Sequence, residues 1–182
     1  MKATPLALPE VLRLEPRLFE DERGWFFESF NARSFAEATG MDVTFVQDNH
    51  SRSARGVLRG LHYQLPPTAQ GKLVRVVAGS VLDVAVDVRK SSPTFGRWVA
   101  ETLDAVSHCQ LWIPAGFAHG FVALSEGAEV IYKTTDFYHR AAERAIRWDD
   151  PDLAIAWPEG LTPILAAKDA AAPRLAEADT FD

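Results

Sequence analysis

Two histidines stand in sequence contexts that could support acid–base chemistry. His62 lies in the run Arg59–Gln64, and His119 lies in the run Pro114–Gly120. An imidazole changes its charge near neutral pH, so either residue could serve as a general base. Imidazole is also a common ligand of first-row transition metals, and a histidine in a strand can simply be a hydrogen-bonded structural residue. Residue type and spacing leave all three roles open.

The Pro-x-Gly-x-x-His run that ends at His119 resembles the second motif of the cupin superfamily, in which this histidine is often a metal ligand. The first cupin metal motif also requires a His-x-His pair and a glutamate. Here Gln64 stands two positions after His62, and no carboxylate takes the expected place. We therefore expect no metal and no cofactor.

Three other side chains could take part in proton transfer. Lys72 begins an apolar strand, where its ammonium could stabilise negative charge on a substrate oxygen or could be a solvated strand end. Tyr132 alternates with Val130 along a strand; it is either a core tyrosine or, if it faces a pocket, a proton donor that stays protonated at neutral pH. Asp169 lies 107 positions after His62, and the sequence alone does not bring the two together.

Several polar groups could bind a substrate. Four arginines cluster in this otherwise acidic chain: Arg52, Arg55, Arg59 and Arg75. They could form a salt-bridged face, or Arg59 together with Arg23 could bind phosphate oxygens, which guanidinium forks match in geometry. A strand also ends in three polar residues that could contact a base or a sugar: Gln47, Asp48 and Asn49.

The elements that would position these residues are short strands. Eleven glycines and eleven prolines separate runs rich in Val, Ile, Phe and Trp, a pattern typical of antiparallel sheets. The clearest strand pair is Leu73–Val77 and Val81–Val88, with a tight turn at Gly79. In the second strand Leu82, Val84, Val86 and Val88 share one face, whereas Asp83 and Asp87 lie on the other. Further strands are expected at Arg17–Phe19, Trp25–Phe30, Thr44–Asn49, Val57–Gln64, Trp98–Leu103, Gln110–Ile113, Gly120–Ala123, Val130–Thr135 and Ile155–Trp157.

Helix is expected to be scarce. A short helix should begin at an Asn31 cap and end at Gly40 with Phe35 inward, and the Ala-rich tail from Lys168 could hold another turn or two. About ten short strands predict an all-β sandwich or barrel. We expect one domain over residues 1–182, with a tail after about residue 170 that could fray.

Composition excludes some classes of function. The 182 residues carry 19 Lys and Arg against 25 Asp and Glu, a net charge of −6, which argues against non-specific binding of nucleic acid or anionic lipid. No run approaches the roughly 20 apolar residues of a membrane span, and Pro5 and Pro9 interrupt the apolar N-terminal stretch. Cys109 is the only cysteine, so no intrachain disulfide can form. We expect a cytoplasmic protein.

Taken together, several blocks of the sequence closely resemble the dTDP-4-dehydrorhamnose 3,5-epimerase family, the cupin-type sugar-nucleotide epimerases. The blocks match in order and spacing along most of the chain: Val46–Ser51, Arg55–Gln64, Gln70–Val76, Ser92–Gly96, Gln110–Phe121 and Tyr132–Asp136. The resemblance implies a cupin jelly-roll β-sandwich, a homodimer and no metal. It also implies epimerisation of dTDP-4-dehydro-6-deoxy-D-glucose at C3 and C5, on the route to dTDP-L-rhamnose.

The same resemblance assigns roles to particular residues. The general base falls on His62, its orienting carboxylate on Asp169 and the general acid on Tyr132, while Lys72 would stabilise the enolate at the C4 oxygen. Tyr138 corresponds to the aromatic residue that stacks on the base. The residues implied to contact nucleotide, diphosphate or sugar are Arg23, Glu28, Gln47, Asp48, Asn49, Arg59, His119, Glu143 and Lys168.

Some positions depart from the family pattern, namely Ala115, His108–Cys109 and Ala166. They leave open an epimerase that inverts only C3 or only C5 of another deoxysugar, or a ketoisomerase of similar fold. Two other classes are a non-catalytic cupin that binds a sugar nucleotide and a metal-dependent cupin oxygenase.

The N-terminal strands suggest how a dimer would form. The segment from about Arg17 to Phe30 is rich in Phe and Trp for a free sheet edge, and edges this hydrophobic invite pairing. We expect this segment of one subunit to extend the partner's sheet.

Overall fold

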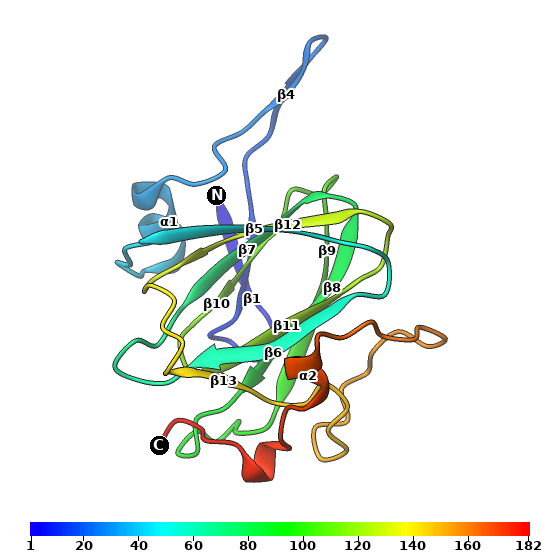
Figure 1. The fold of residues 1–182 in the computed structure, drawn as a ribbon. Coiled ribbons are helices and arrows are strands. Elements are labelled where there is room, and N and C mark those ends of the chain that lie inside the picture. The colour runs from blue at the N-terminus through cyan, green and yellow to red at the C-terminus, as the bar shows by residue number, and fades with distance from the viewer.

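Two antiparallel sheets face each other in a computed structural model that describes residues 1–182 (Figure 1). The six-stranded sheet has the order β1 (Lys2–Pro5), β2 (Leu12–Glu15), β10 (Gln110–Ile113), β7 (Lys72–Ala78), β12 (Ala128–Thr134) and β5 (Gln47–Ser53). The five-stranded sheet has the order β13 (Glu143–Ala145), β6 (Leu58–Gln64), β11 (Phe117–Ala123), β8 (Ser80–Asp87) and β9 (Trp98–Asp104). The predicted all-β jelly-roll sandwich is confirmed.

The space between the sheets holds the main core. Val74 and Leu111 of the six-stranded sheet pack with Val81 and Phe121 of the five-stranded sheet, and all four are buried. The core fills only part of this space, because polar side chains of β6, β7, β11 and β12 line a cavity beside it.

Both sheets are also covered on their outer faces. Phe35 of α1 (Ala32–Thr39) packs with Leu14 and Trp112 on the six-stranded sheet. As predicted, Asn31 caps this helix by accepting from the Ser34 amide, and Gly40 ends it with φ 73°. The outer face of the five-stranded sheet is covered by the segment after β13: Leu153, Ile155, Trp157, Leu175 and Phe181.

The chain crosses between the sheets at Gly79, where the sequence predicted a hairpin. That prediction is wrong: β7 pairs with β10 and β12, whereas β8 pairs with β11 and β9. Gly79 has φ +68°, and a Cβ there would lie 2.1 Å from Ser125 Oγ and 3.2 Å from Ala128 Cα. The glycine is needed for a close crossover between layers rather than for a two-strand turn.

Alternation along β8 is confirmed, but the two aspartates do not face solvent. Asp83 and Asp87 are both fully buried, since they lie on the inner face with Val81 and Ala85 while Val84 and Val86 lie under the covering segment. Because this sheet is buried on both faces, the alternation of apolar and acidic residues along β8 does not distinguish a buried face from a solvent-exposed one.

Other boundaries differ locally from the sequence prediction. Ile155–Trp157 is an irregular covering segment rather than a strand, because its apolar side chains pack across a sheet instead of joining one. Strands β1, β2 and β13 were not predicted. Each is short, with four, four and three residues.

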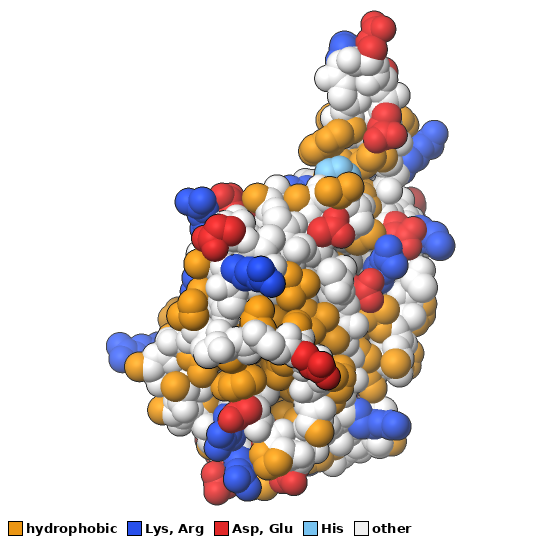
Figure 2. All heavy atoms as spheres, turned by 90° about the vertical axis from the view of Figure 1, so that its right-hand side faces the viewer, with side chains coloured by type: hydrophobic (Ala, Val, Ile, Leu, Met, Phe, Trp, Pro, Cys, Tyr) orange, Lys and Arg blue, Asp and Glu red, His pale blue; other side chains and the backbone are white.

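A hairpin of β3 (Phe19–Asp21) and β4 (Gly24–Phe26) projects from the sandwich (Figures 1 and 2). Its aromatic side chains are exposed, with Phe19 49%, Trp25 58% and Phe26 66% accessible. Only its base is packed, where the Trp25 ring lies 4.3 Å from the His108 ring. The hairpin is therefore an arm whose aromatic side chains have little cover from their own chain.

The tail after residue 170, which the sequence allowed to fray, is bonded to the body. It follows α2 (Ala167–Ala170) and includes a 3₁₀ turn at Leu175–Glu177. The Phe181 amide donates to the Val88 carbonyl, and the Tyr63 hydroxyl donates to the Asp179 carbonyl. These bonds fasten the C-terminal segment beside β8.

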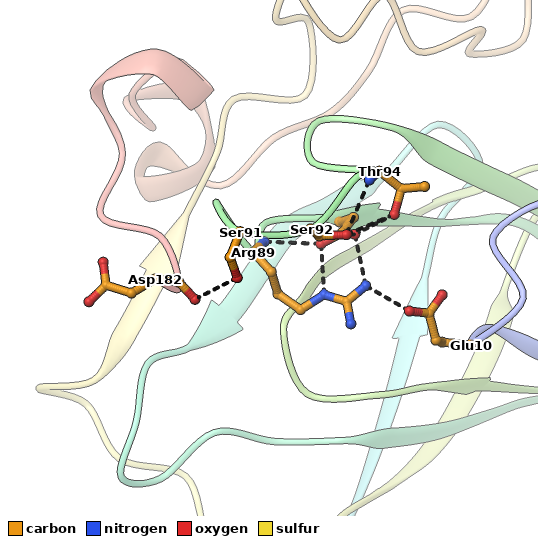
Figure 3. Close-up of polar contacts among 7 residues, drawn as sticks. Glu10, Arg89, Ser91, Ser92, Thr94 and Asp182 are labelled. Atoms are coloured by element: carbon orange, nitrogen blue, oxygen red, sulfur yellow. Dashed lines mark hydrogen bonds and ion pairs between the residues drawn. The ribbon is translucent and has the colours of Figure 1, made fainter.

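The loop after β8 is organised by the buried Asp87 carboxylate. Figure 3 shows the Arg89 guanidinium, which bonds to Asp87 at 2.8 and 2.9 Å and to Glu10 at 3.0 Å. The Ser92 and Thr94 hydroxyls also donate to Asp87. The Ser92–Gly96 block therefore has a structural role, away from the cavity.

No helix of the structure has the length and apolar character needed to cross a bilayer.

Candidate active site

A cavity of about 310 Å³ lies between the two sheets. It brings together nine of the residues singled out in the sequence: Arg59, His62, Lys72, His119, Tyr132, Tyr138, Glu143, Lys168 and Asp169. Its wall also includes Ser51, Gln64, Gln70 and Phe121. Because both sheets and α2 contribute, the site depends on the whole sandwich.

The His62–Asp169 pair is the shortest charged contact in the cavity. His62 Nε2 lies 2.6 Å from Asp169 Oδ1, and Asp169 is only 2% exposed. Burial favours the protonated carboxyl, but the bond from His62 and the Gly60 amide outweigh it, so the pKa of Asp169 lies below its ordinary value. An ionised carboxylate only accepts, so Nε2 carries the hydrogen and Nδ1 keeps its lone pair. No group of the chain bonds to that Nδ1.

Close strand packing puts the pair together. Gly60 on β6 faces Gly120 on β11 so tightly that a Cβ at Gly60 would lie 2.4 Å from Gly120 Cα. His62 and His119 are paired directly across these two strands. The Gly60 amide points to Asp169 Oδ2 at 3.5 Å, which ties β6 to α2.

Lys72 reaches across the sandwich from β7. It is 7% exposed, and its Nζ donates to the His62 carbonyl at 3.0 Å. Burial lowers the pKa of Lys72 to about 8, against the opposing effect of Asp83 and Glu143. The side chain therefore carries a poorly hydrated positive charge near neutral pH, in the cavity rather than at a solvated strand end.

Tyr132 lines the same cavity as His62, from the opposite sheet. Tyr132 belongs to β12 of the six-stranded sheet, whereas His62 belongs to β6 of the other sheet. Burial raises the pKa of Tyr132 although the charges of Arg59 and Lys168 oppose that shift. The phenol is thus protonated at neutral pH and is available as a donor.

A second group of side chains lies at the rim. Glu143 accepts from Lys168 Nζ at 2.8 Å and from the Tyr138 hydroxyl at 3.1 Å. The Tyr138 ring is 53% exposed. Its amide donates to Gln47 Oε1 at 3.0 Å, so Gln47 supports the loop that carries this aromatic ring.

Gln64, the residue in place of a cupin metal ligand, is used to hold the same loop. Its amide group donates to the Thr68 and Phe137 carbonyls and accepts from the His139 amide. The structure contains no group of three or more His, Cys, Asp or Glu side chains arranged to hold a metal ion.

Five predicted binding residues do not line the cavity, and one of them is Gln47, which only supports its rim. Asp48 lies on the opposite face of β5, where it pairs with Lys133 at 3.0 Å, and Asn49 bonds to Gln47. Arg23 lies in the projecting hairpin and pairs with Asp21, while Glu28 accepts from Asn31. The chain does not bring Arg23 or Glu28 to its own cavity.

One buried group at the site was missed by the sequence interpretation. Asp83 bonds through both oxygens to His119 Nε2, at 2.9 and 3.0 Å. The alternation of β8 did separate Asp83 from its apolar neighbours, and this was the signal that could have drawn attention to it.

One known protein family matches almost the whole chain. The family model described as dTDP-4-dehydrorhamnose 3,5-epimerase matches residues 5–177. The chain belongs to the dTDP-4-dehydrorhamnose 3,5-epimerase family. Its membership confirms the predicted epimerase class and the double epimerisation that the resemblance implied.

Individual members of the dTDP-4-dehydrorhamnose 3,5-epimerase family are similar to this chain in sequence and in structure. The dTDP-4-dehydrorhamnose 3,5-epimerase of Pseudomonas aeruginosa is 62% identical over 181 residues, covering 100% of this chain and 99% of that protein. The enzyme of the same name from Shigella flexneri is 56% identical, with the same coverage. The crystal structure of dTDP-6-deoxy-D-glucose-3,5-epimerase from Legionella pneumophila, in complex with dTDP-4-keto-L-rhamnose, superposes with a TM-score of 0.94 at 51% identity, covering 98% of this chain and 94% of that chain.

Proposed function

We propose that this epimerase inverts C3 and C5 of dTDP-4-dehydro-6-deoxy-D-glucose with His62 as base, Tyr132 as acid and Lys72 as the enolate-stabilising cation. One observation carries the proposal: a carboxylate-bonded histidine and a protonated tyrosine line one cavity from opposite sheets, with a buried ammonium beside the histidine. This arrangement suits proton removal from one side of a ring and proton return from the other.

The first step breaks a C–H bond beside the C4 ketone. His62 Nδ1 takes the proton, while the hydrogen on Nε2 stays bonded to Asp169 at 2.6 Å. The electron pair of the C–H bond moves into the enolate, whose oxygen becomes negative. The Asp169 carboxylate stabilises the imidazolium that forms.

Lys72 lowers the energy of that enolate. Its ammonium carries three hydrogens, of which one is donated to the His62 carbonyl. The others are free to donate to the C4 oxygen. A charge-assisted hydrogen bond of this kind is strongest where water is excluded, and Lys72 is buried.

Tyr132 then delivers a proton to the carbon from the opposite face. The C–H bond re-forms with inverted configuration, and solvent restores the phenol while His62 releases its proton. The cycle consumes no oxidant, reductant or metal. Repeating it at the second carbon gives the doubly inverted product.

The nucleotide end of the substrate would lie at the rim. Arg59 and Lys168 supply positive charge for the diphosphate, and the exposed Tyr138 ring supplies a flat surface on which the thymine can stack. The structure of the Legionella pneumophila relative is a complex with dTDP-4-keto-L-rhamnose, which supports a site for this class of ligand. We propose that Gln47, whose Oε1 accepts from the Tyr138 amide at this rim, contacts the sugar or the base together with Asn49, to which it is bonded.

A homodimer would complete the site. Arg23 and Glu28 belong to the projecting arm, which leaves its own cavity and exposes aromatic side chains. We propose that the arm of one subunit pairs with the partner's sheet, which buries these rings and brings Arg23 and Glu28 toward the partner's cavity. The expected mass in sedimentation at micromolar concentration is about twice the 20.1 kDa of the chain. A species near the single-chain mass would refute the dimer. A cytoplasmic location, in which Cys109 stays reduced, belongs to the same proposal.

The mechanism is tested by solvent exchange in deuterated water. Wild-type protein should incorporate deuterium at both C3 and C5, whereas His62→Ala should lose exchange at both carbons by at least roughly a hundredfold. Tyr132→Phe should retain some exchange but lose inversion, because His62 can still form the enolate. Label at one carbon in wild type would favour an enzyme that inverts one centre, and exchange that survives in His62→Ala would show that another group is the base.

A further inference from the structure

A second buried histidine–carboxylate pair lies in the same cavity. His119 is 6% exposed and Asp83 is fully buried, and both oxygens of Asp83 bond to His119 Nε2. Asp83 has no other hydrogen-bond partner in the chain. Burying a carboxylate with a single partner costs free energy of folding, which indicates that Asp83 has a role at the neighbouring site.

The bond fixes the chemical character of His119. Because the Asp83 carboxylate accepts from Nε2, the neutral ring carries its hydrogen there and presents the lone pair of Nδ1. Burial lowers the pKa of His119, and the charges of Lys72 and His62 act in the same direction, whereas Asp83 opposes them. At neutral pH the ring is therefore a neutral hydrogen-bond acceptor in the cavity.

Asp83 also acts on the charge of Lys72. Lys72 Nζ donates to the His62 carbonyl, and His62 is paired across the strands with His119, the partner of Asp83. The other titratable groups of the cavity are Arg59, His62, Tyr63, His119, Tyr132, Tyr138, Glu143, Lys168 and Asp169. Asp169 is bonded to His62, and the two carboxylates that hold up the pKa of Lys72 are Asp83 and Glu143. Of these two, Glu143 is paired with Lys168, whereas Asp83 is bonded to no lysine or arginine.

We propose that Asp83 is a positioning residue of this epimerase, which holds His119 in one tautomer and keeps Lys72 charged beside the C4 ketone; this rests on the function proposed above. Asp83 acts through these two side chains and does not touch the substrate. Its burial on the inner face of β8 places it behind His119, away from the open part of the cavity.

The test is the pH dependence of kcat in Asp83→Asn. Asparagine keeps the size of the side chain and a hydrogen-bonding group beside His119 Nε2, so the ring stays in place while the negative charge is lost. An opposite charge nearby commonly moves a pKa by about one unit or more. The alkaline limb of kcat, set by Lys72, should therefore move to lower pH by about one unit, so that kcat at pH 8 falls about fivefold. At pH 6 kcat should stay within about twofold of wild type, and KM should change little.

Asp87→Asn is the matched control. Asp87 is a fully buried carboxylate four residues along the same strand, but it bonds to Arg89, Ser92 and Thr94 outside the cavity. Its substitution should lower the unfolding temperature without moving the alkaline limb. A shifted limb in Asp87→Asn, or an unchanged limb in Asp83→Asn, would overturn the proposal.

Deuterium exchange separates the remaining outcomes. In Asp83→Asn at pH 8, exchange at C3 and C5 should fall by the same factor, because both enolates share one oxygen. Loss at one carbon alone would make His119 a second base and would overturn the positioning role. If wild-type protein exchanges no deuterium, the proposed function itself fails, whatever the pH profile of the variant.

Discussion

The replacement Asp169→Asn tests whether the carboxylate controls the protonation of His62. In the wild type, a carboxylate 2% exposed lies 2.6 Å from His62 Nε2 and can only accept. An asparagine amide can rotate and donate instead. Nε2 would then become the acceptor, the hydrogen would move to Nδ1, and the cavity would face an N–H rather than a lone pair.

The size of the effect follows from what is lost. A positioned base contributes about a hundredfold or more, and the corresponding carboxylate-to-amide change in Ser-His-Asp hydrolases lowers kcat by about 10⁴. We therefore expect kcat to fall by about 10²–10⁴, or about 3 to 5.5 kcal/mol of barrier. KM should change much less, because Asp169 lies behind His62.

Two measurements complete the test. Steady-state kinetics separate kcat from KM, and NMR in deuterated water measures exchange at each carbon. Glu143→Gln is the control, because it neutralises another carboxylate of the cavity that bonds to Lys168 and Tyr138 instead of His62, so that it should affect mainly KM. A kcat for Asp169→Asn within about threefold of wild type, or a loss confined to KM, would refute the reasoning.

Three further predictions follow from the same geometry. Lys72→Met should remove activity yet raise the free energy of unfolding at pH 7. Burial lowers the pKa of Lys72 from 10.5 to about 8, so the charged lysine destabilises the fold below pH 8 by up to about 3 kcal/mol. The variant loses the bond to His62, which reduces its gain in stability by about 1 kcal/mol. The gain should disappear above pH 10.5, and a destabilised variant in denaturant titrations at pH 7 would contradict this. Arg59→Ala should mainly raise KM, because phosphate contacts distant from the reacting carbons bind ground state and transition state nearly alike; an unchanged KM would count against the assignment. Protein treated exhaustively with EDTA should keep its activity, and restoration of lost activity by a divalent ion would exclude the metal-free mechanism.

The sequence identified most of the side chains that line the cavity because chemistry restricts them. His62, Lys72 and Tyr132 are residue types that proton transfer requires, and each stands in a strand whose alternation could be recognised. Asp169 could be linked to His62 only through the family resemblance, since contact across 107 positions leaves no local pattern. The fold brings them together through α2.

The features that the sequence could not predict are those that depend on how the two sheets and their covering segments stack. Alternation along Val81–Val88 separates two faces but does not say which one faces a core, so it did not indicate that Asp83 is buried. A glycine turn at Gly79 likewise does not distinguish a hairpin from a crossing between sheets. For the projecting arm, the sequence does not show what covers its aromatic rings, because that cover does not come from its own chain.

The attachment of His62 and Tyr132 to opposite sheets has a consequence for the movement of the substrate. Each side chain extends from a hydrogen-bonded strand, and packed sheets resist sliding past one another. If His62 and Tyr132 act as proposed, the protein cannot move its base from C3 to C5 between the two inversions. The proposed mechanism then requires the sugar to rotate about its diphosphate while the nucleotide stays bound at the rim. In that mechanism the two inversions differ in the orientation of the sugar ring rather than in protein conformation, and their order is set by which carbon first meets the base.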